Sequence, residues 1–210
     1  MSLPSSNAPA LRDTLILAAL NLMRETNSWS FSLREVARRA GVSHNAPYRH
    51  FADKAELLAA IGTAGYDALR GGLDRAAKSD ADAVKALRAF IRSFISFALD
   101  DPSRHRLMVG NDLQDMDGSI APELKAAADG ARQVLKDLLL RGGANGQFAI
   151  TINDPDDVSA AVVTIWALLH GYTLLELDRL RHLETLIDVD DLTGRVADRI
   201  IFGLIAPSAS

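Results

Sequence analysis

A capped helix followed by a glycine turn, within SLREVARRAGVSHNAPYRHF at 32–51, constrains this chain more than any other feature. Ser32 and Glu35 form an S-x-x-E capping box, which satisfies the free amides at a helix start and predicts a helix over 33–40. Gly41 follows at the position where a left-handed backbone ends a helix without steric cost. The segment therefore predicts a short helix with a defined start and a defined end.

A second short helix is predicted after this turn, over about 44–50, with Ser43 as its cap. Two helices joined by a short turn that contains glycine form the helix-turn-helix unit, whose second helix enters the major groove of DNA. The segment 43–54 is rich in basic and polar side chains, a composition that suits phosphate binding. An ordinary helical hairpin is the alternative, because capped short helices with a glycine turn are common.

Two stretches of this sequence carry a family resemblance. Residues 33–58 hold a turn ending in G-V-S, then Y-x-H-F, then a Lys in the next helix, and the run 165–177, IWALLHGYTLLEL, holds W-x-x-x-H-G. The first stretch resembles the DNA-binding domain of the TetR family of transcriptional repressors. The second is shorter and is similar to the WHG-type C-terminal domain found in one branch of that family.

Caps and apolar periodicity along the chain predict about nine helices, and the resemblance implies an all-α fold. It places a three-helix DNA-binding domain, here called the head, at 8–54. A larger effector-binding and dimerisation domain, here called the body, follows at 55–207. We expect the helix that begins near Lys54 to be the covalent connection between the two.

The DNA contacts are expected at the second reading helix and its neighbours. Tyr48, His50 and Lys54 match the family positions that hold phosphate, and phosphate contacts carry no sequence information. His44 and Asn45 occupy the first turn of the helix predicted at 44–50, and Asn can pair bidentately with adenine. Capping or phosphate contact is the alternative for both. The predicted DNA-binding set is Ser32, Arg34, Ser43, His44, Asn45, Tyr48, Arg49, His50 and Lys54.

The net charge of −4 divides unevenly between the two predicted domains. Residues 1–54 hold seven Lys or Arg and four acids, a net charge of +3, whereas the remainder holds 16 bases and 23 acids, a net charge of −7. A basic head on an acidic body would meet DNA with the head alone. A chance fluctuation of this size is the alternative.

Composition excludes several classes of protein. The absence of cysteine removes disulfides, thiol redox sensing and Cys-ligated zinc. No apolar run is expected to reach the roughly 18 residues that span a bilayer, and no signal-peptide pattern is present. A soluble, cytoplasmic protein with no membrane partner and no cofactor is therefore expected.

Trp166, His170 and Thr173 share one face of a helix predicted from 154 to about 180. His170 has two interpretations, a hydrogen-bonded core histidine or a polar group in an effector pocket. The pocket residues predicted on the second interpretation are Phe90, Phe94, His105, Met108, Trp166, His170 and Thr173. A metal site at the two histidines and a carboxylate such as Asp112 has no supporting local spacing, so none is predicted.

The last two predicted helices, 154–180 and 189–205, carry more apolar surface than one chain needs to cover. A single reading helix touches only a few base pairs, so the DNA geometry also requires a two-fold dimer. The sequence therefore predicts a homodimer through about 154–205.

The function predicted from these features is a ligand-responsive repressor. Its homodimer would bind a palindromic operator in double-stranded DNA, and an unknown small-molecule effector would release it by tilting the helix that begins near Lys54. A helical enzyme and a protein-binding adaptor on the same scaffold stay open as alternatives. No catalytic residues are predicted, because no nucleophile elbow, metal motif or nucleotide loop is present.

Overall fold

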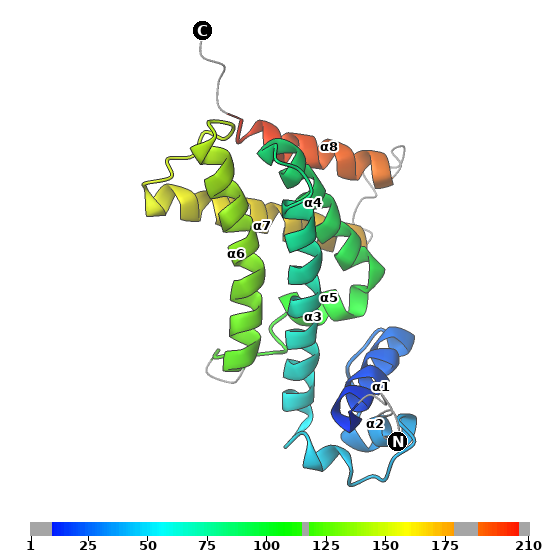
Figure 1. Ribbon diagram of the computed structural model, residues 1–210. Helices are drawn as coiled ribbons and strands as arrows, with labels where there is room; N and C mark the ends of the chain where they lie inside the picture. The colour runs from blue at the N-terminus through cyan, green and yellow to red at the C-terminus, as the bar shows by residue number, and fades with distance from the viewer. Residues whose placement is uncertain (1–9, 115–117, 179–188, 206–210) are drawn as a thin grey trace, which may run out of the picture.

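The computed structural model of this chain describes residues 10–114, 118–178 and 189–205. The start of the predicted head at 8, the end of the predicted body at 207 and residue 180 lie outside these ranges. Within them the fold is all-helical, as predicted, and Figure 1 shows the arrangement. The helices are α1 (Leu11–Thr26), α2 (Leu33–Arg39), the 3-10 helix η1 (Pro47–Arg49), α3 (Lys54–Ala77), α4 (Ala83–Asp100), α5 (Pro102–Val109), α6 (Pro122–Ala144), α7 (Pro155–Leu177) and α8 (Val189–Phe202).

The long helix α3 connects the head, formed by α1, α2 and η1, to the body. It rises from the head alongside α6, and α4 packs against both (Figure 1). α7 crosses behind these upright helices, and α8 lies across the end of the body away from the head. The short helix α5 contacts α1, α3 and α4.

Acidic caps and prolines set the predicted helix starts. The carboxylate of Asp53 accepts a hydrogen bond from the Glu56 amide (2.9 Å), and that of Asp154 accepts one from the Asp156 amide (3.0 Å). Pro122 and Pro155 occupy the first helical position, where a missing amide costs nothing. The sequence also predicts a helix that begins at Pro122, so the predicted starts of α3, α6 and α7 are confirmed.

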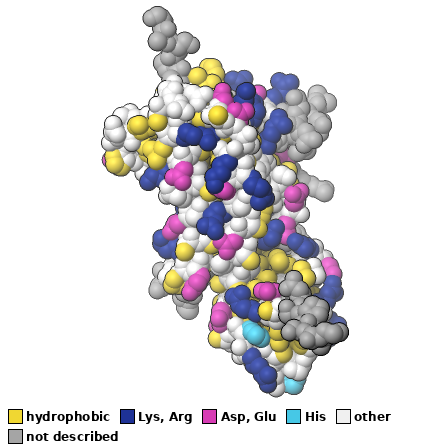
Figure 2. All heavy atoms as spheres, viewed as in Figure 1, with side chains coloured by type: hydrophobic (Ala, Val, Ile, Leu, Met, Phe, Trp, Pro, Cys, Tyr) yellow, Lys and Arg dark blue, Asp and Glu magenta, His cyan; other side chains and the backbone are white. Residues whose placement is uncertain are grey.

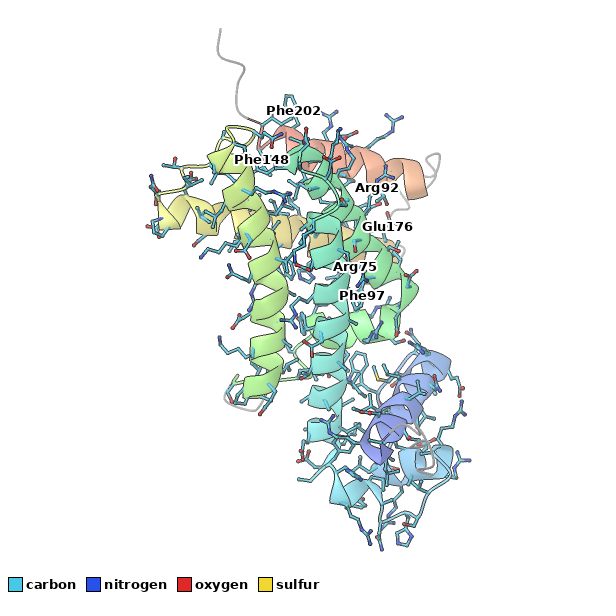
Figure 3. The ribbon with its side chains drawn as sticks, in the orientation of Figure 1. Arg75, Arg92, Phe97, Phe148, Glu176 and Phe202 are labelled. Carbon is cyan, nitrogen blue, oxygen red and sulfur yellow. The ribbon has the colours of Figure 1, made fainter. Side chains whose placement is uncertain are left out.

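The end of α6 differs from the prediction. The sequence predicts that the helix opened by Pro122 ends at Arg141 and Gly142, but the helix continues to Ala144. The left-handed residue that ends it is Gly146 (φ 68°). Gly142 instead leaves room for Phe148, because a Cβ there would collide with the Phe148 ring. Figure 3 shows Phe148 beside this end of α6.

Two hydrophobic cores stabilise the molecule. The head's core combines α1 and α2 with Phe51, with the first turns of α3 and with the fully buried Leu107 of α5. The body's core takes the rest of α3 together with α4, α6, α7 and α8. Because α5 also contributes Met108 to the body's core, this helix of eight residues belongs to both.

Two glycines of α3 make room for side chains at this junction. A Cβ on Gly65 would lie 2.5 Å from Sδ of Met108, and one on Gly62 would lie 2.7 Å from Cδ1 of Leu113. Glycine inside a helix costs about 1 kcal/mol relative to alanine. Close packing of these two side chains against α3 offsets that cost.

The helix α7 is long and apolar enough to cross a membrane by length and composition, with a mean hydropathy of 1.6 in its most apolar window. The expectation concerned uninterrupted apolar runs, and polar residues such as Ser159, Thr164 and His170 interrupt the run in α7, so this property of the helix was not identified from the sequence. The helix passes the test because it is apolar on both sides. Ile165, Leu169 and Thr173 are buried in the body, whereas Leu168 and Leu175 are each 48% exposed. One side of α7 fills the core, and the other side is exposed.

Candidate DNA-binding surface and internal cavity

The first reading helix, α2, begins and ends as predicted. Oγ of Ser32 accepts a hydrogen bond from the Glu35 amide (3.2 Å). At the other end Gly41 has φ 69°, and its amide and that of Val42 donate to the carbonyls of Arg38 and Ala37. This paired arrangement is the Schellman motif. It fixes the direction in which the chain leaves α2.

The second reading helix is not the α-helix predicted over 44–50. The chain forms a turn at 44–45 and then the three-residue η1. Pro47 explains the difference, because it has no amide hydrogen to donate to the Ser43 carbonyl and so cannot close the first α-helical turn. The Ala46 amide bonds the Ser43 carbonyl (2.9 Å), and the Arg49 amide bonds the Ala46 carbonyl (3.2 Å). Both bonds span three residues, which is the 3-10 pattern.

The predicted DNA-binding residues lie on α2, on η1 with its preceding turn, and at the start of α3. These elements form the lower end of the head, where Figure 2 shows Lys, Arg and His side chains. His50 and Lys54 are half-buried. Nζ of Lys54 lies 5.6 Å from the centre of the Phe31 ring, which holds the ammonium group beside the start of α3. The exposed members of the set are Ser32, Arg34, Ser43, His44, Asn45, Tyr48 and Arg49.

Two other arginines of the head are engaged within the protein. Arg39 forms an ion pair with Glu25 of α1, and Arg24 forms one with Asp101 of α5 (2.7 Å). These pairs brace α1 against α2 and against the body. Some of the head's positive charges are therefore neutralised by ion pairs within the protein, and the others lie at the lower surface of the head.

A cavity of about 350 Å³ lies between α3, α5, α6 and α7. This volume falls in the usual range for small-molecule sites. Of the seven predicted pocket residues, three line the cavity: Met108, Trp166 and His170. The other lining residues are Tyr66, Val109, Gly110, Leu113, Gln114, Ile120, Leu124, Ala128, Arg132 and Leu174.

Three further predicted pocket residues lie behind this wall. The ring of Phe94 meets Trp166 and His170 edge-on, with ring centres 5.4 and 5.1 Å apart. His105 is buried and shares a hydrogen bond with Thr173 (3.2 Å from Nε2 to Oγ1). Phe90 is fully buried in the body's core and does not line the cavity. Of the predicted set, three residues thus form the cavity wall, three lie behind it, and Phe90 belongs to the body's core.

His105 and His170 are stacked, with ring centres 5.8 Å apart and an angle of 22° between the planes. The Thr173 hydroxyl lies 3.0 Å from the carbonyls of Leu169 and His170 and can donate its one proton there, so Nε2–H of His105 donates to its oxygen. Nδ1 of each histidine is buried without a hydrogen-bond partner in the described part of the chain.

Burial keeps both histidines neutral near pH 7. It lowers the pKa of His105 to about 4, with smaller contributions from His170 and Arg106. Burial also lowers the pKa of His170 to about 4, with a smaller contribution from Arg132. The cavity wall therefore presents a neutral imidazole. Among the described residues, no group of three His, Asp or Glu side chains is placed to hold a metal ion.

The helix α5 joins the cavity to the head. At its cavity end, the Tyr66 hydroxyl donates to the Met108 carbonyl (2.9 Å). On its head side, Ser103 donates to Oδ1 of Asn27, the residue that ends α1 (3.1 Å). The guanidinium of Arg106 lies 3.4 Å from the same oxygen and donates to the carbonyl of Leu177 at the end of α7 (2.8 Å). A displacement of α5 would therefore reach α1 directly.

A second hollow, of about 580 Å³, is a groove between α7 and α8. Its wall is largely apolar and includes Leu168 and Leu175 of α7 with Leu192 and Val196 of α8. A Cβ on Gly171, in the same groove, would meet nothing within 4 Å. Figure 3 shows Phe202, which is 77% exposed, on α8 at the end of the molecule away from the head.

Comparison with known families decides what this arrangement is. Residues 15–61 match bacterial regulatory proteins of the tetR family, and residues 87–200 match the tetracyclin repressor-like C-terminal domain. The chain belongs to the TetR family. TetR-family regulators are ligand-responsive, DNA-binding transcription regulators, and the family and fold of this chain are regulatory rather than enzymatic.

Individual relatives and solved structures are also similar to this chain. The HTH-type transcriptional activator FasR of Mycolicibacterium smegmatis is 30% identical over 130 residues, which cover 62% of this chain and 59% of FasR. A protein with unknown function from Rhodococcus sp. RHA1 is 26% identical with a TM-score of 0.80, over 97% of this chain and all of that one. The TetR regulator PfmR of Thermus thermophilus is 22% identical with a TM-score of 0.66, over 90% and 97% of the two chains, and shares the fold.

Several residues that shape this TetR regulator's cavity were missed in the sequence. Tyr66 and Arg132 lie on α3 and α6, which the sequence presents as ordinary amphipathic helices. Arg132 follows Asp129 by three residues, and this spacing is typical of an exposed surface pair. The role of Arg106 depends on contacts to residues far away in the sequence, Asn27 and Leu177. Local patterns carry no signal for such contacts.

Proposed function

We propose that this TetR regulator is a cytoplasmic repressor that binds a palindromic operator as a homodimer and leaves it when a small molecule enters the cavity. The observation that carries the proposal is the position of α5, whose Met108 lines the cavity and whose Leu107 fills the head's core. A ligand that displaces Met108 acts on the head through adjacent residues.

DNA recognition would divide between two groups of side chains. Tyr48, His50 and Lys54 are expected to hold phosphates and so set the register of the head on the duplex. His44 and Asn45 are exposed in the turn before η1 and are expected to meet base edges. The shortened second helix leaves these two residues at its tip.

The homodimer would form through α7 and α8, within the predicted range 154–205. Both helices contribute apolar side chains to the groove, and exposed leucines lie along α7. Gly171 is unexplained by contacts inside one protomer, since glycine weakens a helix and nothing lies within 4 Å of its Cβ position. A helix of the second protomer, packed closely against this glycine, accounts for it.

Release from DNA would be a shift between two states of the dimer. An effector can act only through different affinities for the DNA-bound and released states. The sequence predicted a tilt of α3, and the contacts add α5 as the element that moves with it. A movement of Met108 would disturb the hydrogen bond that Tyr66 of α3 donates to the Met108 carbonyl, and the contacts of Arg106 to Asn27 and to the end of α7.

The test of the proposed function measures DNA binding and oligomeric state together. Fluorescence anisotropy with a labelled fragment from upstream of the protein's own gene should show binding that weakens steeply with salt, because phosphate contacts release counterions. Light scattering should show a dimer, which Leu168→Glu converts to monomer. Leu17→Glu, at a comparably exposed leucine of α1, is the matched control and should stay dimeric.

The direction of regulation has its own measurement, since FasR is named an activator. A reporter behind the upstream fragment should rise when the gene for this protein is deleted. A fall of the reporter signal on deletion would make the protein an activator and would reject the repressor assignment.

The adaptor alternative predicts a different result. Salt-independent capture of a protein, with no DNA binding, would favour it.

A further inference from the structure

We infer that the cavity takes an amphiphilic monoacid, with its carboxylate at Arg132 and its apolar part in the interior. This inference rests on the proposed function, because it names the chemical class of the effector. It depends on the position of Arg132, on the charges around the cavity and on the apolar wall.

Arg132 is the charged residue among the described lining residues of the cavity. It also lines a smaller outer hollow of about 320 Å³ between α6 and α7, which includes Lys136 and Ser159. Its side chain is 41% exposed. The guanidinium thus lies where the interior meets solvent, and a ligand group held there would remain partly hydrated.

Breaking the ion pair between Arg132 and its present partner, Asp129, should cost little free energy. Asp129 forms an ion pair with Arg132, but it also binds Nζ of Lys125 at 2.7 Å. If a ligand carboxylate took over the guanidinium, Asp129 would keep Lys125 as its partner. Lys125 and Arg132 together carry two positive charges, and Asp129 neutralises only one of them, so a ligand can neutralise the other. A carboxylate matches an arginine with two parallel charge-assisted hydrogen bonds.

The rest of the described wall favours a single negative charge. His170 is neutral and offers no second charge, although Nδ1 has no partner within the described residues and can meet a polar atom of a ligand. The Tyr66 hydroxyl already donates to Met108. Gln114 is neutral, and no acid is among the lining residues that the structure describes. An organic cation would meet the repulsion of Arg132, and no carboxylate among the described lining residues could bind it.

The inner wall is suited to a hydrocarbon part. Its apolar members come from four segments of the chain and enclose the space from several sides, and they are Leu113, Ile120, Leu124, Trp166 and Leu174. Burial of each methylene group there should strengthen binding about fourfold. The combination of this wall with one cation at its rim describes the two ends of an amphiphile.

The test uses three probes of equal chain length: octanoate, 1-octanol and octylammonium. The full-length Trp29→Phe variant leaves Trp166 as the fluorophore at the cavity. Octanoate should change its fluorescence with an affinity at least about tenfold above that of 1-octanol, and octylammonium should bind more weakly than either. Hexanoate should bind more weakly than octanoate by a factor of about ten or more.

Two variants of α6 then locate the head group. Arg132→Gln should lose at least about tenfold in octanoate affinity and leave 1-octanol unchanged. Lys125→Gln, which removes the other cation of Asp129 but does not line the cavity, should weaken octanoate binding by less than Arg132→Gln does, because Asp129 then competes with the ligand for Arg132. Thermal melting checks that both variants fold.

The outcomes separate this inference from the proposed function. Equal affinity for octanoate and 1-octanol, or tighter binding of octylammonium, would reject the acid while the cavity remained an effector site. An unchanged octanoate affinity in Arg132→Gln would likewise reject Arg132 as the head-group site. Failure of all three probes to bind would reject both the inference and the cavity as the effector site.

Discussion

Arg24 of α1 and Asp101 at the start of α5 form an ion pair that joins the head to the body, with 2.7 Å between Nη2 and Oδ2. The Asp101 side chain is 3% exposed, and its other oxygen caps α5 through the Arg104 amide. A buried carboxylate that loses a partner is costly, so this pair should matter more to stability than an exposed pair.

The first prediction concerns this ion pair. Arg24→Met should lower the free energy of unfolding by about 1–3 kcal/mol, because it leaves Asp101 with Arg104 as its remaining cation. Arg39→Met is the matched control, since it breaks the exposed pair with Glu25 and should cost about 0–1 kcal/mol. Urea denaturation of both variants measures the difference. Equal losses would show that the Arg24 pair has no special role.

The second prediction concerns phosphate binding. Lys54→Ala should weaken binding to all DNA sequences by a similar factor and reduce the slope of log affinity against log salt by about one unit. Anisotropy titrations at several salt concentrations measure both quantities. A changed operator preference would mean that Lys54 reads sequence.

The third prediction concerns base reading by Asn45. A bidentate contact to adenine discriminates by about 1–3 kcal/mol, so Asn45→Ala should relax the preference at one position in each half-site. Selection from randomised DNA gives the consensus of each protein. If Asn45→Ala and the wild type selected the same consensus, Asn45 would not read bases and would serve only the structure of the turn before η1.

The fourth prediction concerns His170. Nδ1 of this ring has no partner in the described part of the chain, so His170→Leu removes little that the fold requires. The variant should keep its melting temperature and its operator affinity but lose release by the effector. Melting and anisotropy are measured on the same preparation. Early melting combined with normal release would make His170 a core residue.

The fifth prediction concerns pH. Because burial holds the pKa of His105 and His170 at about 4 in the folded protein, against 6.5 for an ordinary histidine, the unfolded chain binds more protons between these values. Stability should be unaffected by these rings above about pH 6.5 and should fall as the pH drops towards about 4. Urea unfolding at intervals across this window measures the trend. In the double variant His105→Leu/His170→Leu the slope in this window should become shallower.

Local signals in the sequence were enough to predict most of the fold. The capping residues, the left-handed glycine after α2 and the prolines at helix starts each act over a few residues, and the structure confirms them. The prediction of an α-helix over 44–50 was wrong because Pro47 removes one backbone hydrogen bond. In so short a helix, that bond decides between the α and 3-10 forms. The absence of one backbone amide hydrogen thus prevented the α-helix that the pattern predicted there.

The cavity was predicted only in part, for a different physical reason. Trp166 and His170 share a helix face, and that relationship is visible in the sequence. Arg132, Tyr66 and Leu113 reach the same space from three other segments, and their convergence depends on how the helices pack. Helical periodicity identifies the buried side of a helix but does not say which helices that side meets.

The membership of Leu107 in the head's core limits how far the two parts of this regulator can be exchanged. A chimera that grafts the segment up to residue 61 onto the body of a related regulator would inherit a foreign side chain at the Leu107 position and a foreign partner for Arg24. A stable graft would have to transfer α5 together with the head, although most of α3 and all of α4 separate them in the sequence. Recombination during evolution faces the same restriction, so a head and its α5 are expected to be inherited together.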